Sequence, residues 1–115
     1  MKTRAKGTRV RKKCRELLEG AGFLVDVVEK TGKFNKETDL FGLFDLIALN
    51  DSGLPTYVQV TCSNPHTSKP YQEFIDKYGN KHMRVVQYVW IDRTGWILYD
   101  YQQHKKYSRV KLYEN

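Results

Sequence analysis

The chain has 115 residues, of which 40% are hydrophobic, and 20 Lys and Arg against 13 Asp and Glu give it a formal net charge of +7. This length suits a single domain with a modest core over residues 1–115, and the composition excludes wholesale disorder. A basic domain of this size attracts polyanions, of which nucleic acid is the commonest in a cell, although a merely soluble basic surface would have the same balance.

The two cysteines, Cys14 and Cys62, do not have metal-ligand spacing, and we expect both to be small buried hydrophobes in a reducing compartment. No apolar run approaches the ~18 residues of a membrane span. The basic N-terminus is not followed by an apolar signal segment. The sequence therefore predicts an intracellular, cytoplasmic protein with no membrane partner.

A basic helix is predicted near the N-terminus. The first 15 residues hold eight Lys or Arg and no acid. Residues 1–6 are expected to form a basic arm, and a helix follows because apolar residues recur at helical spacing at Val10, Cys14, Leu17, Leu18 and Ala21. Gly20 and Gly22 end it. The remaining helix positions carry the charges Arg9, Arg11, Lys12, Lys13 and Arg15.

Three strands are expected next. The Val-rich residues 23–29 predict a strand, and the polar residues 31–42, with two Gly, predict a loop. The short apolar run 44–49 is typical of a buried strand. Strong turn residues at 50–53 separate it from another strand at 57–62, and so short a link implies an antiparallel hairpin.

The second half of the chain predicts a helix and two or three further strands. The helix covers residues 68–78, with Pro70 in its first turn and Gly79 at its end. Strands follow at 83–91 and 96–101, and residues 108–113 can add an edge strand. The order predicts an α/β protein with a central mixed sheet flanked by helices. Aromatic residues alternate with Val and Ile in the late hairpin, which favours packing over base stacking: Tyr88, Trp90, Trp96 and Tyr99.

A candidate metal site lies in the predicted hairpin. Asp45 opens a buried strand between Phe44 and Leu46, where a carboxylate is costly unless it is paired, hydrogen-bonded or metal-bound. Gln59 and Thr61 are two residues apart, so they share one face of the next strand, and that face can point toward Asp45. These oxygen donors suit Mg²⁺. The alternative is a strand-start cap with Gln59 and Thr61 on a solvated face.

Several segments of the sequence resemble the PD-(D/E)XK nucleases, above all the small archaeal and phage Holliday junction resolvases. They are residues 6–23, FDLIAL at 44–49, VQVT at 58–61, VWIDR at 89–93 and Trp96. The resemblance implies a restriction-endonuclease-like core and a metal-dependent endonuclease that uses Mg²⁺ or Mn²⁺. It further implies phosphodiester hydrolysis in branched or distorted DNA, in recombination or repair, by a homodimer.

Carried over onto this chain, the resemblance makes Asp45, Gln59 and Thr61 the catalytic residues, with Asp45 and Gln59 as metal ligands. Two positions depart from the family's pattern. Thr61 stands where the family has Lys, and Arg11 stands where it has a helix Glu. Candidates to replace the missing Lys are Lys33, Lys36 and Lys69, and candidates to replace the missing acid are Glu37 and Asp39. A solvated polar loop is the favoured interpretation of these two acids.

The sequence leaves two functions open. The first is a DNA-binding, metal-dependent endonuclease; the second is an inactive DNA-binding module that keeps the nuclease fold. In both, sequence-independent phosphate contacts are expected from Arg9, Arg11, Lys12, Lys13, Lys33, Lys36 and Lys69. His66 and His104 are predicted to be surface histidines without a role.

Overall fold

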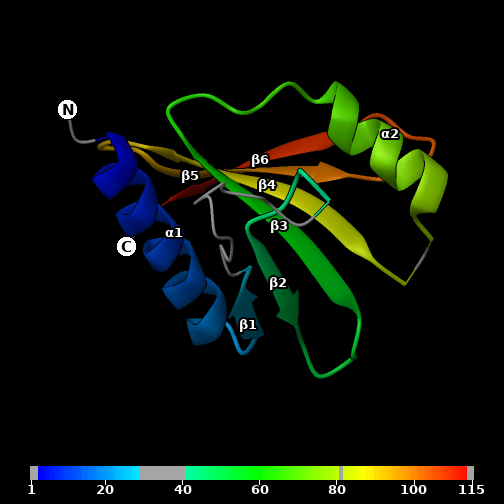
Figure 1. Cartoon of the computed structure of the whole chain (residues 1–115), viewed down its shortest axis with the longest axis horizontal. Coiled ribbons are helices and arrows are strands. Elements are labelled where there is room, and N and C mark those ends of the chain that lie inside the picture. Colours follow the sequence, from blue (N-terminus) through cyan, green and yellow to red (C-terminus); the bar gives the residue numbers. More distant parts are fainter. Residues whose placement is uncertain (1–2, 29–40, 81, 114–115) are drawn as a thin grey trace, which may run out of the picture.

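The computed structural model describes residues 3–28, 41–80 and 82–113. These residues form a six-stranded mixed sheet with a helix packed on each face (Figure 1). The elements in chain order are α1 Thr3–Gly20, β1 Leu24–Val27, β2 Leu46–Leu49, β3 Pro55–Cys62, α2 Lys69–Tyr78, β4 Arg84–Ile91, β5 Gly95–Tyr101 and β6 Ser108–Tyr113. The predicted α/β class and mixed sheet are confirmed.

Neighbouring strands in the sheet are also neighbours in the chain, in the order β1-β2-β3-β4-β5-β6. All pairs are antiparallel except the central pair, β3 and β4, which the crossover through α2 makes parallel. The predicted hairpin is confirmed, with Leu46 opposite Val58. Gly53 in its turn has a φ of 77°, a conformation that glycine adopts at no steric cost.

α1 buries the narrow apolar stripe Val10, Cys14 and Leu18 against the sheet. Leu17, predicted on the same stripe, is 41% exposed, because a helix of this kind presents only about a third of its surface to the sheet. The helix begins at Thr3, so residues 3–6, expected to form an arm, are part of it.

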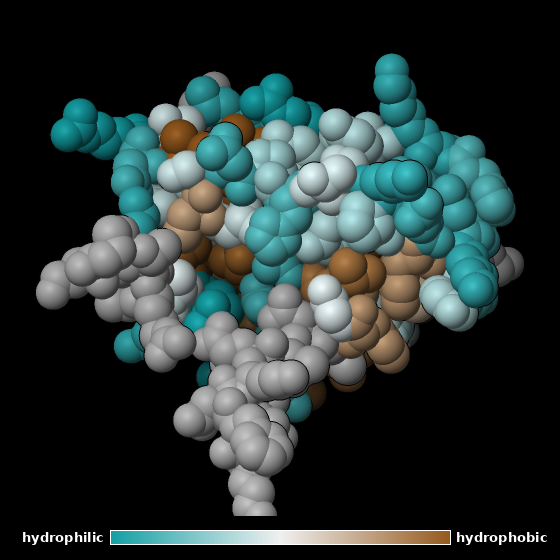
Figure 2. Space-filling view, turned by 45° about the horizontal axis from the view of Figure 1, so that its top comes forward, coloured by the Kyte–Doolittle hydropathy of each residue, from teal (hydrophilic) through white to brown (hydrophobic). Residues whose placement is uncertain are grey.

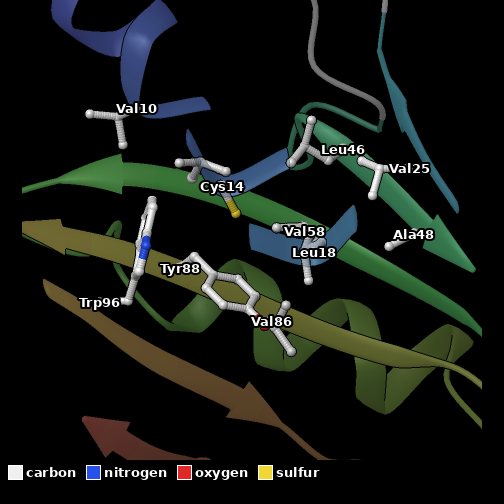
Figure 3. Close-up of a cluster of buried hydrophobic side chains, with 11 residues drawn as sticks. Val10, Cys14, Leu18, Val25, Leu46, Ala48, Val58, Val86, Tyr88 and Trp96 are labelled. Atoms are coloured by element: carbon white, nitrogen blue, oxygen red, sulfur yellow. The ribbon is translucent and has the colours of Figure 1, made fainter. Parts of the chain in front are cut away.

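Two hydrophobic cores lie on opposite faces of the sheet, and alternate residues of β3 and β4 contribute to each. The α1-side core, drawn in Figure 3, places Val58, Val86 and Tyr88 beneath α1. The α2-side core contains Phe44, Tyr71 and other residues that include Ile75, Val85, Val89, Tyr99 and Tyr101. The face of any β3 or β4 residue follows from this alternation.

The aromatic residues of the late hairpin pack inside the protein, as predicted. Trp96 is 3% exposed and meets the rings of Tyr88 and Trp90 edge-on, at centroid distances of 5.9 and 5.2 Å. Tyr99 lies on the other face. In the part of the chain that the structure describes, no helix is long and apolar enough to cross a membrane.

Candidate active site and nucleic-acid interface

Asp45 lies just before β2 and is 7% exposed. Its backbone N–H donates to the Val58 carbonyl at 2.8 Å, and its Oδ2 accepts the Val60 N–H at 3.1 Å. Both bonds reach β3 on either side of Gln59, so the structure places Asp45 opposite Gln59. The carboxylate is also near enough to Cys14 on α1 for its charge to add to burial in raising the pKa of that thiol.

Gln59 and Thr61 are buried, at 4% and 9% exposure, so the solvated-face alternative for them is wrong. They share the α2 side of the sheet, since Tyr57 and Val89, which belong to the α2-side core, have the same alternation. Gln59 Nε2 donates to the Val60 carbonyl at 3.3 Å. Gln59 Oε1 and Thr61 Oγ1 have no hydrogen-bond partner among the described residues.

Unpartnered buried oxygens are costly, and a ligand or ion that binds them removes that cost. Asp45, Gln59 and Thr61 supply one carboxylate, one amide oxygen and one hydroxyl, which fits Mg²⁺ because this ion takes few protein oxygens and keeps several waters. This set of ligands is small, however, and contains a single carboxylate. Across residues 3–28, 41–80 and 82–113, no three His, Cys, Asp or Glu side chains gather as metal ligands would.

Arg11, at the position where the resemblance leads one to expect Glu, is partly buried, and its Nη2 donates to Thr8 Oγ1 at 3.3 Å. Burial raises the pKa of the Cys62 thiol, and the nearby charge of Arg11 is among those that oppose the rise. Arg11 therefore brings a positive charge to the end of β3, near Cys62. Such a charge repels a metal ion and attracts a phosphate.

Only part of the predicted basic face of α1 is exposed, and some of its cations contact other side chains. Arg9 and Lys12 are exposed. The Lys13 ammonium lies 4.1 Å from the centre of the Trp90 ring, a cation–π contact. Lys6 Nζ lies 2.7 Å from Asp92 Oδ2.

Figure 2 shows hydrophilic residues over most of the visible face and hydrophobic ones in a band across its middle.

Of the other predicted phosphate contacts, Lys69 is exposed at the first residue of α2. Lys33 and Lys36, with the candidate acids Glu37 and Asp39, lie outside the described residues.

A buried polar network, which the sequence analysis missed, lies beside Gln59. Gln87, the register partner of Gln59 on β4, is fully buried. Its Oε1 accepts the His66 N–H at 2.9 Å, and its Nε2 donates to the His66 carbonyl at 3.0 Å and to the Tyr101 hydroxyl at 2.8 Å. The Tyr101 hydroxyl donates to Ser68 Oγ at 3.0 Å. The His66 ring meets the Tyr71 hydroxyl, with 3.0 Å between Nδ1 and the oxygen.

No protein-family model matches the chain, and no curated protein matches it. A solved structure similar to it is that of Hjc from Archaeoglobus fulgidus, a Holliday junction resolvase from an archaeal hyperthermophile. The TM-score is 0.57, the sequence identity is 16%, and the match covers 91% of this chain and 88% of that one. At this identity the likeness shows a shared fold, which is the nuclease-like fold that the resemblance implied.

Proposed function

We propose that this chain binds DNA and hydrolyses its phosphodiester bonds with a divalent metal ion, at branched or distorted sites. The observation that carries the proposal is the position of Asp45 opposite Gln59, whose Oε1 is buried without a partner. The similarity to a Holliday junction resolvase over most of the chain supports it. DNA in recombination or repair intermediates is the substrate class that this similarity suggests.

Asp45 and Gln59 would hold Mg²⁺ or Mn²⁺, and Thr61 would orient water by its hydroxyl. The ion, when bound, lowers the pKa of a water molecule and offsets charge on the phosphate. The α1 cations Arg9 and Lys12 would bind the DNA backbone without sequence preference. Arg11, beside the end of β3, would contact a phosphate there.

The second candidate is a DNA-binding module without catalysis. It is favoured by the single carboxylate of the site and by Thr61, which cannot supply the positive charge of the expected Lys. In this alternative, Arg11 binds a phosphate where the family holds a metal. A homodimer is proposed for both candidates, because two copies present two basic faces to the arms of a branched substrate.

One gel distinguishes the candidates. A labelled four-way junction, a duplex and a single strand are each incubated with the protein in Mg²⁺, Mn²⁺ or chelator. An endonuclease cuts the junction with either metal and not with chelator. A binding module shifts the junction and the duplex equally in all three conditions and cuts nothing. Absence of any shift would remove both candidates.

A further inference from the structure

The α2 side of the central strands carries a buried polar cluster. The corresponding α1-side positions of β3 and β4 are apolar, at Val58, Val60, Val86 and Tyr88. On the α2 side, Gln59, Thr61 and Gln87 are all at least 91% buried. Buried polar side chains in a central sheet cost free energy, and such local exceptions gather at functional sites.

The cluster fixes one exposed residue, His66, in the loop between β3 and α2. Gln87 bonds both the N–H and the carbonyl of His66, so a side chain holds this loop residue as a neighbouring strand would. Tyr71, which is 2% exposed, then fixes the ring through Nδ1. The backbone and the ring of His66 are thus both positioned from the protein interior, which is how binding side chains are held in place.

The other ring nitrogen, Nε2, has no hydrogen-bond partner among the described residues, and the residue is exposed. When the Tyr71 hydroxyl donates to Nδ1, the neutral ring carries its proton on Nε2, and the ring becomes a donor toward solvent. Lys69 is exposed three residues further along the chain. A ring N–H donor and a lysine on the same exposed stretch of chain both suit an anionic oxygen.

We infer that His66 Nε2 donates a hydrogen bond to a backbone phosphate of bound DNA, and that Gln87 and Tyr71 are the positioning residues for this contact. The inference rests on the proposed DNA binding. It adds a contact on the α2 side of the sheet to those of α1, so the DNA spans the end of β3. Catalysis is not required for it.

The test uses the full chain with isotope-labelled histidine and a short DNA duplex. Substitutions His66→Gln, His82→Gln and His104→Gln assign the three ring signals. On titration with DNA the ring signal of His66 shifts, and that of His82, which is exposed two residues before β4, stays in place. Inorganic phosphate at the same phosphate concentration shifts the His66 signal far less, because the other contacts to the DNA backbone are missing.

Affinity measurements complete the test. His66→Ala, which leaves no donor at this position, lowers DNA affinity about tenfold, the value of one hydrogen bond to a charged group, whereas His82→Ala leaves it unchanged. Tyr71→Phe keeps the ring packing and changes the tautomer signature of His66 in nitrogen-correlated spectra, a readout that a purely structural tyrosine would not move.

Two outcomes would overturn the inference. If the wild type binds DNA but the His66 signal stays in place and His66→Ala binds as tightly as His82→Ala, the phosphate contact is wrong and the proposed DNA binding stands. The same holds if His66→Ala impairs cleavage alone, which would make the ring a base for catalysis. If the wild type binds no DNA at low salt, the proposed function fails and this contact fails with it.

Discussion

Asp45 ties β2 to β3 through its side chain as well as its backbone. Asp45→Asn keeps an oxygen that can accept the Val60 N–H, so the fold should survive. It removes the only carboxylate that the described residues bring to the candidate site, and one negative charge that would face a bound phosphate. We expect metal-dependent cleavage of a labelled junction to fall to background, while DNA affinity stays equal or rises.

The companion variant is Thr61→Lys, which restores the residue that the resemblance leads one to expect. It should raise cleavage if the missing positive charge limits the reaction. If it has no effect, Arg11→Glu combined with Thr61→Lys is the next variant. A double variant that folds, binds DNA and still does not cut would leave only the binding module.

Cys14 provides a pH test of the fold at the level of one residue. Burial and the Asp45 charge raise the pKa of its thiol above the ordinary value of 9.0. A raised pKa stabilises the folded state below pH 9, and this stabilisation is lost as the pH rises, because only the unfolded thiol ionises there. Between pH 9 and 10 the free energy of unfolding should fall by up to about 1.4 kcal/mol.

The measurement is denaturant unfolding at each pH, with Cys14→Ala and Cys62→Ala as the pair of variants. Cys14→Ala should remove most of the dependence between pH 9 and 10. Cys62→Ala should remove less, because Cys62 is only partly buried and the charges of Lys6 and Arg11 oppose the rise in its pKa. An equal effect of the two variants would contradict the assignment.

The sequence reveals Asp45 and not His66, for a physical reason. An acid flanked by Phe44 and Leu46 is conspicuous because burial of a carboxylate is costly. The partners of His66 are 5 and 21 residues away and meet it only after α2 has crossed the sheet. The sequence does mark Gln87, because it is a polar residue within an apolar strand. In the structure it is the register partner of Gln59.

At the scale of elements, α1 has a buried face and a proposed DNA-binding face that can be tested separately. Arg9→Ala with Lys12→Ala removes two exposed cations of α1 that form no ion pair among the described residues. The slope of log affinity against log salt should flatten by about 2, since each phosphate contact contributes about 0.9. Fluorescence anisotropy with one duplex at several salt concentrations measures it.

The matched control is Lys105→Ala with Lys106→Ala, which removes the same charge from the exposed turn between β5 and β6. Its salt slope should stay close to that of the wild type. Equal flattening by both pairs would mean that net charge, and not the face of α1, determines binding.

The buried face of α1 has its own pair of variants. Leu18→Ala, at 4% exposure, should cost about 2–5 kcal/mol of the free energy of unfolding, because it leaves a cavity beneath the helix. Leu17→Ala, at 41% exposure, removes the same atoms from a largely solvated position and should cost less than about 1 kcal/mol. Similar losses of unfolding free energy in the two variants would contradict the burial of Leu18 and the exposure of Leu17 on α1.

Most elements are predictable because their periodicity or turn residues are local, and the differences are at strand ends. The predicted strand 44–49 is shortened to Leu46–Leu49. Its first residues leave the regular ladder because the Asp45 side chain, and not a backbone carbonyl, accepts the Val60 N–H. β3 begins earlier than predicted, at Pro55, which is allowed at the first position of a strand.

At the scale of the whole molecule, the two cores share one sheet, so we expect the single domain of the sequence analysis to unfold in one step. Both Trp90 and Trp96 report on the α1 side. Ile75→Ala on the α2 side should therefore shift the tryptophan fluorescence transition and the far-ultraviolet circular dichroism transition by the same amount. Separate midpoints would mean that the two faces unfold independently.

The single parallel pair at the centre of the sheet has a consequence for how the chain folds. β1-β2-β3 and β4-β5-β6 are two antiparallel meanders that form from contacts between consecutive strands, whereas β3 and β4 meet only after α2 has crossed over. Closing the connection between β3 and β4 costs conformational entropy before their contacts can offset it. Docking of the two meanders should therefore limit the folding rate. Mutations at the β3–β4 seam should slow folding, and mutations on β1 or β6 should mainly speed unfolding.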